Sequence, residues 1–179
     1  MFLVKNGQVE QLSLLFQKYH VRLFNFFIGM TGDRAASEDL TQEVFLRILR
    51  FRQTFKGKGT FKSWMFQIAR NVSIDYFRKQ RKTDSLDDRF HDIIVAESTP
   101  YDESVQDQET QILHQALDRL SFKHREVLML ARFQEMPLKE VADVLKCPVN
   151  TVKVRVHRAI KELGAIYSEL TGVQQHAVR

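Results

Sequence analysis

The stretch Pro137–Leu163, PLKEVADVLKCPVNTVKVRVHRAIKEL, predicts two short helices joined by a tight turn, and the rest of the chain is interpreted from it. Pro148 ends the first helix, because proline cannot continue a helix and disfavours helical dihedrals in the residue before it. Asn150 is a good N-cap, so we expect the second helix to begin near Thr151. The apolar face of the first helix repeats at spacings of three and four. It consists of Leu138, Val141, Ala142 and Leu145.

The second predicted helix has one apolar stripe and one polar, basic face. The stripe consists of Val152, Val156, Ala159, Ile160 and Leu163. The other face holds Asn150, Thr151, Lys153, Val154, Arg155 and Arg158. This pattern is typical of a helix-turn-helix, whose second helix enters the major groove of DNA. The alternative at this point is an ordinary helical hairpin whose charges are only solvated.

The composition limits the fold class and the compartment. A chain of 179 residues, 44% of them hydrophobic, with three prolines and seven glycines, predicts one or two small domains made mainly of helix. The single cysteine, Cys147, excludes an internal disulfide and a multi-cysteine metal site, and we expect it only to pack. No window approaches the roughly 18 uncharged apolar residues of a membrane span, so we expect a cytoplasmic protein without membrane insertion.

The charge is divided into three blocks along the chain. Residues 1–82 hold 15 basic and 6 acidic side chains, a net charge of +9. Residues 83–109 hold 1 basic and 9 acidic ones, net −8, and residues 110–179 hold 11 and 7, net +4. Basic blocks indicate phosphate binding, and the acidic stretch between them is typical of a solvated linker. We hypothesise that this linker folds back on a basic domain through Asp84, Asp87, Asp88 and Asp92.

The N-terminal block predicts three helices. The first begins at Gln8 and ends near Gly29 and Gly32, and its aromatic residues have the spacing of a buried face. The second begins near Asp33 and carries acidic residues at its start and arginines at its end, as the helix dipole favours. Its carboxylates Glu38, Asp39 and Glu43 also raise the alternative of a metal-dependent nuclease. No histidine lies at a matching spacing, so we expect no catalytic and no metal site.

A basic glycine loop, Lys56–Thr60, precedes the third helix. It lacks the Gly-Lys-Ser/Thr ending of a nucleotide-binding P-loop. The helix that follows, FKSWMFQIARNVSIDYFRKQRK over residues 61–82, combines aromatic residues with a basic end. Such a combination suits single-stranded or melting DNA, although Trp64 is more simply explained as a core anchor.

Three motifs in this order resemble the bacterial RNA polymerase sigma factors of the small extracytoplasmic-function (ECF) group, in the sigma-70 superfamily. The likeness covers Leu15 to Leu170. SEDLTQEVFLRIL, residues 37–49, is similar to the core-binding helix of sigma region 2, and residues 61–82 are similar to its promoter-melting helix. Residues 117–163 are similar to sigma region 4.

The resemblance implies an all-α protein of two small helical domains joined by a flexible acidic linker. Region 2, a helix bundle, would occupy 8–82, the linker 83–108, and region 4, a helix-turn-helix, 109–172. Such a protein has no cofactor and is not an enzyme. It binds core RNA polymerase, directs it to promoter DNA and helps to melt the minus-ten element, and an anti-sigma factor is an expected partner. The alternative, a stand-alone helix-turn-helix regulator, leaves the basic aromatic helix unexplained.

The resemblance also assigns residues to three contacts. Core polymerase would be contacted by Asp39, Gln42, Glu43 and Arg47. The minus-ten element would be held by Lys56, Lys58, Thr60, Asn71, Asp75, Arg78, Lys79, Arg81 and Lys82. The minus-thirty-five element would be read by Asn150, Thr151, Lys153, Val154, Arg155 and Arg158. Family members often have glycine in place of Asn150 and serine in place of Val154; the valine offers only an apolar contact, such as one to a thymine methyl group.

Overall fold

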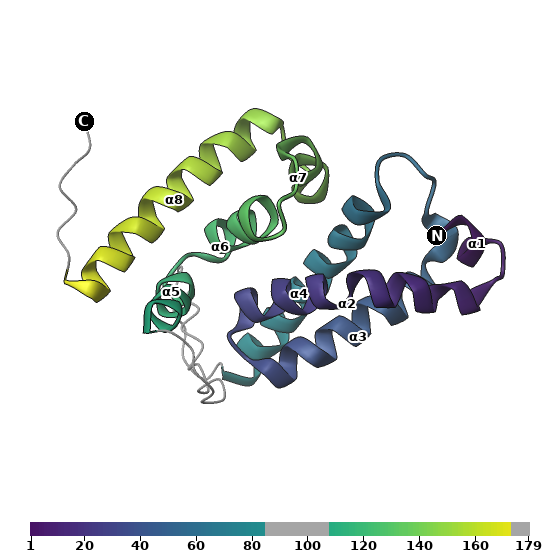
Figure 1. Ribbon diagram of the computed structural model, residues 1–179, viewed down its shortest axis with the longest axis horizontal. Helices are drawn as coiled ribbons and strands as arrows, with labels where there is room; N and C mark the ends of the chain where they lie inside the picture. Colours follow the sequence, from purple (N-terminus) through teal and green to yellow (C-terminus); the bar gives the residue numbers. More distant parts are fainter. Residues whose placement is uncertain (85–107, 173–179) are drawn as a thin grey trace.

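The structure is a computed structural model that describes residues 1–84 and 108–172 (Figure 1). Within these ranges the chain contains helices and no strand, so the predicted all-α class is confirmed. The N-terminal half contains α1 (Phe2–Lys5), the 3-10 helix η1 (Val9–Gln11), α2 (Leu12–Thr31), α3 (Arg34–Arg50), the 3-10 helix η2 (Arg52–Thr54) and α4 (Phe61–Asp84). The C-terminal half contains α5 (Gln108–Asp118), α6 (Phe122–Leu128), the π-helical turn η3 (Met129–Phe133), α7 (Leu138–Leu145) and α8 (Val149–Thr171).

The predicted linker, residues 83–108, lies almost wholly outside the described residues. The side chains of Asp84, Asp87, Asp88 and Asp92 also lie outside the described part, so the hypothesis that the linker folds back on a basic domain stays a prediction. What the structure does give are the two flanking helices, α4 ending at Asp84 and α5 beginning at Gln108.

Helix α2 ends at a glycine, and α3 begins at an aspartate cap. Gly32 adopts a left-handed conformation, with φ of 68°, and its backbone N–H donates to the carbonyl of Ile28. Asp33 then accepts a hydrogen bond from the Ala36 N–H at 3.0 Å. These two signals make the tight turn between α2 and α3, and of the two predicted stops, Gly29 and Gly32, the helix uses Gly32.

Several aromatic residues of the N-terminal half fill its core, but Phe16, which was predicted on the buried face of the first helix, is 42% exposed. Phe26, Phe27 and Phe66 are fully buried, and the Phe26 ring meets the other two edge-on at 5.3 and 5.5 Å. Trp64 is partly buried, with its ring 5.3 Å from that of Phe55. It therefore anchors the start of α4 in the bundle.

The helix-turn-helix consists of α7 and α8, and the predicted capping role of Asn150 is wrong. Pro148 has an extended ψ of 147°, and its carbonyl accepts the first helical bond from the Val152 N–H at 3.2 Å. Helix α8 therefore begins at Val149, because proline has no N–H to satisfy and its fixed φ suits the position before a helix. Asn150 lies in the first turn with its side chain exposed. Cys147, in the turn, is a free, partly buried cysteine that packs against the core.

The two halves lie side by side (Figure 1). Their buried side chains form one continuous core. Helix α7 packs against α4, and the π-helical turn η3 contacts α2, where the end of the Met129 side chain packs directly on Gly29. Polar contacts join the same surfaces. They are Lys62 Nζ to the Gln134 carbonyl (2.8 Å), Ser63 Oγ to Glu140 (3.1 Å), Gln67 Nε2 to the Asp143 carbonyl (3.1 Å) and Arg125 Nη1 to the Met30 carbonyl (2.8 Å).

Candidate nucleic-acid interface

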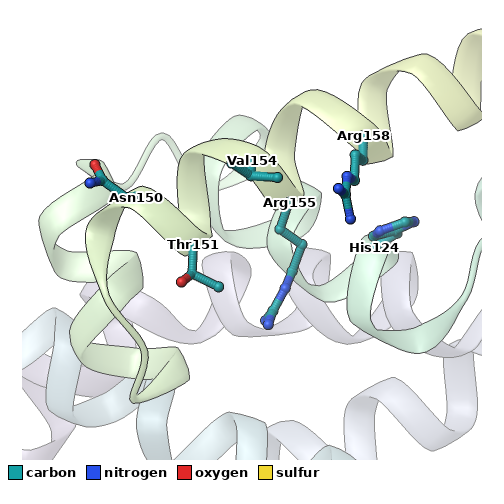
Figure 2. Close-up of a pocket in the computed structure, with 6 residues that line it drawn as sticks. All are labelled: His124, Asn150, Thr151, Val154, Arg155 and Arg158. Atoms are coloured by element: carbon teal, nitrogen blue, oxygen red, sulfur yellow. The ribbon is translucent and has the colours of Figure 1, made fainter.

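One side of α8 presents the predicted reading residues to solvent. Val152, Val156 and Ala159 face the core, which turns the intervening positions of a 3.6-residue repeat outward. An open hollow of about 430 Å³ is lined by Asn150, Thr151, Val154, Arg155, Arg158 and His124. Figure 2 shows the first five along α8, with His124 on α6 beside Arg158. Lys153 is exposed but lies outside this hollow.

His124 is a residue of this hollow that the sequence did not indicate. Its Nδ1 contacts the Glu162 carboxylate, which joins the start of α6 to the middle of α8. Ser121 caps α6 by accepting a hydrogen bond from the His124 N–H at 3.4 Å. The histidine thus ends on the same surface as Arg158, although 34 positions separate the two in the sequence. Only tertiary packing reveals that closeness.

A buried carboxylate lies behind this surface. Glu126, on α6, is 1% exposed, and its Oε1 is 2.9 Å from Arg70 Nε of α4. The two side chains form a close ion pair whose hydrogen-bond geometry is poor. Burial raises the pKa of Glu126 to about 7, against the attraction of Arg70 and of Arg155 on α8, which lowers it. Glu126 therefore interacts electrostatically with Arg70 of the N-terminal half and with Arg155 of α8.

The basic glycine loop is fully on the surface. Residues 56–60 are all exposed, and Gly57 and Gly59 have φ of 70° and 80°, which other residues rarely adopt. The Thr60 hydroxyl accepts a hydrogen bond from the Ser63 N–H at 3.1 Å and so caps α4. It also lies 3.3 Å from Glu140 of α7, so part of the C-terminal half contacts the end of this loop.

Farther along α4 the predicted minus-ten residues form one exposed face. Asn71, Arg78 and Lys79 are exposed, while Asp75 is partly buried. Arg81 and Lys82 continue the helix, but their side chains lie outside the described part of the structure.

Arg47 joins two of the predicted contact surfaces. Its Nε lies 2.6 Å from Glu43, and its Nη1 lies 2.8 Å from Asp75 of α4. Burial lowers the pKa of Arg47, but the hydrogen bonds and charges of Glu43 and Asp75 outweigh it and raise that pKa above its ordinary value. Asp39 and Gln42 remain exposed on α3, together with Leu46, which is 61% exposed. Leu46 lies four residues after Gln42 on the same face, a spacing that could have indicated it.

The Glu43–Arg47–Asp75 network should contribute little to stability. We expect a double-mutant cycle of Arg47→Ala and Asp75→Ala, measured by urea unfolding, to give a coupling free energy of about 0.5 kcal/mol, because both side chains are partly solvated and screened. The coupling should shrink further at 1 M salt. A coupling free energy above about 2 kcal/mol that did not change with salt would show that Arg47 and Asp75 are not a weak, screened ion pair.

Comparison with known families and proteins agrees with this geometry. Residues 15–83 match the family Sigma-70 region 2, and residues 110–163 match the family Sigma-70, region 4. Over 159 residues the chain is 34% identical to the ECF RNA polymerase sigma factor SigX of Bacillus subtilis strain 168, a match that covers 86% of this chain and 82% of SigX. The chain belongs to the ECF RNA polymerase sigma factors.

Further comparisons of this sigma factor support the same family and fold. It is 29% identical over 169 residues to the ECF sigma factor SigW of the same bacterium, covering 89% of this chain and 90% of SigW. Its fold is shared with RpoE from Bartonella quintana, solved with the anti-sigma factor NepR, at a TM-score of 0.69 and 24% identity, covering 91% and 98% of the two chains. CnrH, solved with the cytosolic domain of CnrY, gives a TM-score of 0.71 at 21% identity, covering 93% of each chain.

As a sigma factor the protein directs RNA polymerase to promoters, and its partners are core RNA polymerase and promoter DNA. A stand-alone regulator is not favoured, because it leaves the match to region 2 unexplained. Sigma factors as a class are non-catalytic initiation factors. Among residues 1–84 and 108–172, no helix is both long and apolar enough to cross a bilayer. In the same ranges, the carboxylates of α3 do not gather with further ligands as a metal ion would require.

Proposed function

We propose that this sigma factor divides its work among three surfaces. The polymerase surface is formed on α3 by Asp39, Gln42, Glu43 and Arg47. The minus-ten surface is the loop Lys56–Thr60 with Asn71, Asp75, Arg78, Lys79, Arg81 and Lys82 of α4, and it helps to melt the DNA. The minus-thirty-five surface is formed on α8 by Asn150, Thr151, Lys153, Val154, Arg155 and Arg158. We also propose that regions 2 and 4 act as domains over 8–82 and 109–172, separated by the acidic linker 83–108.

The observation that carries the assignment is the exposed face of α8. Two arginines, an asparagine and a threonine share one open hollow with an apolar valine. Arginine and asparagine form paired hydrogen bonds with guanine and adenine in the major groove, and valine can meet a thymine methyl group. The first turn of the helix is free to approach the bases, since Asn150 is exposed there.

The minus-ten assignment rests on charge and shape. Lys56 and Lys58 are exposed on a glycine loop that is held at its end by the Thr60 cap. Lysines of this kind attract the phosphates of a separated strand, and a loop of exposed backbone can approach an unstacked base. The protein performs no chemistry of its own in this proposal and works in the cytoplasm.

We further propose that an anti-sigma factor regulates this protein. The related fold of RpoE was solved with the anti-sigma factor NepR, which supports such a partner. Exposed apolar side chains on two of the three proposed surfaces, Leu46 beside the polymerase residues and Val154 among the reading residues, offer contacts that a protein partner would bury.

Core-polymerase binding tests the proposal directly. The double variant Gln42→Ala/Glu43→Ala should bind core polymerase about tenfold more weakly than the wild type, because two polar contacts at one interface are lost, one from the exposed Gln42 and one from the partly buried Glu43. The measurement is a titration of labelled sigma factor with purified core enzyme. Glu10→Ala/Gln17→Ala removes the same residue types from exposed positions outside α3 and should bind as the wild type does. Equal affinity of all three proteins would show that α3 does not contact polymerase through these residues.

A further inference from the structure

Helix α1 lies outside the family match and yet contacts the basic loop. It spans Phe2–Lys5, whereas the match to region 2 begins at residue 15. Val4 is fully buried, which fixes this single helical turn to the bundle. The other side of the turn faces the segment that leads from η2 into the loop Lys56–Thr60.

Two hydrogen bonds connect α1 to the beginning of the loop. Lys5 Nζ donates to the Phe55 carbonyl at 2.7 Å, and Gln53 Nε2 donates to the Lys5 carbonyl at 3.0 Å. The bond from Lys5 is charge-assisted, and such bonds are stronger than neutral ones. The backbone directly before Lys56 is therefore held by a residue about 50 positions earlier in the chain.

The ring of Phe2 extends the contact into the loop itself. It lies 5.2 Å from the ring of Phe55, which is 4% exposed and in turn 5.3 Å from Trp64 of α4. A Cβ on Gly57 would lie 2.5 Å from Phe2 Cζ, so the ring covers this glycine closely. Gly57 also has φ of 70°, a conformation that the absence of a side chain allows.

We infer that α1 is a positioning element for promoter opening, acting through Phe2 and Lys5 on the Lys56–Thr60 loop. The Thr60 cap fixes the end of the loop, and α1 fixes its beginning. A loop with two glycines would otherwise sample many conformations, and ordering it when DNA binds would weaken the interaction. The inference rests on the proposed role of this loop at the minus-ten element and adds residues that the family match does not contain.

The test uses holoenzyme assembled with purified core polymerase, on a promoter first mapped by run-off transcription with the wild type. Opening is followed with 2-aminopurine in the minus-ten element. Phe2→Ala and Lys5→Ala should each slow opening about tenfold, equivalent to about 1.4 kcal/mol, with core affinity unchanged. Preference for the cognate minus-ten base over a substituted one should fall as well, which a general loss of stability does not produce. Phe2→Tyr keeps the ring and should restore opening.

Two further variants separate the possible failures. Leu3→Ala shortens an exposed side chain of the same helix and should open the promoter at the wild-type rate. Lys56→Ala/Lys58→Ala tests the loop itself and should be strongly defective. If the loop variant is defective while Phe2→Ala and Lys5→Ala behave as Leu3→Ala does, the positioning role is wrong and the minus-ten assignment stands. If the loop variant opens normally, the minus-ten assignment fails and the inference fails with it. Lys5→Ala decides the question if Phe2→Ala unfolds.

Discussion

The free energy of unfolding should fall by about 3 kcal/mol between pH 4.5 and pH 7 on account of Glu126 alone. Well below pH 4.5, the ordinary pKa of the group, its carboxyl group is protonated in both the folded and the unfolded chain, and its contribution to stability is fully present. As the pH rises, the unfolded chain ionises first, while the folded protein keeps the proton until the pKa of about 7 is passed. The contribution is therefore lost between about pH 4.5 and pH 7. Well above pH 7 the carboxyl group is ionised in both states, and its effect on the free energy of unfolding no longer changes with pH.

Urea unfolding of the wild type and of Glu126→Gln from pH 4.5 to pH 8.5 measures this. The amide of glutamine does not titrate, so the difference between the two proteins isolates Glu126 from other ionising groups. Near pH 4.5 the two proteins should be almost equal in stability, because the protonated carboxyl group and the amide are both neutral and similar in size. As the pH rises, a margin in favour of Glu126→Gln should grow, because only the wild type must bury an ionised carboxylate. A margin that does not change with pH would show that the carboxylate is not buried in a way that opposes its charge.

A second control addresses the partner of this carboxylate. Replacing Arg70 and Glu126 together by apolar residues, as in Arg70→Met/Glu126→Leu, should remove the pH dependence at little cost in stability, since buried ion pairs are often matched by apolar pairs of similar volume. Arg70→Ala alone should destabilise more at pH 8.5 than at pH 5.5. At the lower pH Glu126 is already neutral, and no ion pair is lost.

The sequence predicted the helices and most of the buried side of α8, because both depend on local spacing; Ile160, which was expected on the apolar stripe, is 42% exposed. Val152, Val156 and Ala159 are buried as their repeat predicted, and this alone turns Val154 and Arg158 outward. The error at Asn150 was also local. Asparagine and proline both suit the start of a helix, and the choice depends on the ψ of Pro148, which residue type does not determine.

What the sequence could not predict depends on contacts between distant segments. Glu126 follows Arg125 in a short polar run and has the pattern of a surface residue, but α4 covers it in the fold. The closeness of His124 to Arg158 and the contact of Lys5 with Phe55 are of the same kind. Periodicity within one helix identifies the buried face, but it does not identify which partner covers that face.

Removing both arginines of the proposed minus-thirty-five surface on α8 should weaken promoter binding by holoenzyme about 30-fold or more. Each arginine that contacts a phosphate or a base contributes about 1 to 3 kcal/mol, so the loss of Arg155 and Arg158 amounts to at least about 2 kcal/mol. Both line the hollow on α8, and Arg158 is exposed there (Figure 2). The measurement is a titration of duplex promoter DNA with holoenzyme carrying Arg155→Ala/Arg158→Ala, at several salt concentrations.

The matched control is Arg119→Ala/Arg132→Ala, which removes two exposed arginines of the same half outside this hollow. It changes the net charge equally, so a difference between the two double variants measures location and not charge. If both arginines of α8 contact phosphates, the slope of log affinity against log salt should become shallower by about 2 for Arg155→Ala/Arg158→Ala, since each phosphate contact releases about 0.9 counterion. If one of the arginines contacts a base instead, its loss should relax selectivity at one position of the minus-thirty-five element, and the salt slope should become shallower by less than about 2. Equal losses for both double variants would mean that only overall charge attracts the DNA, and α8 would then lose its role as the reading helix.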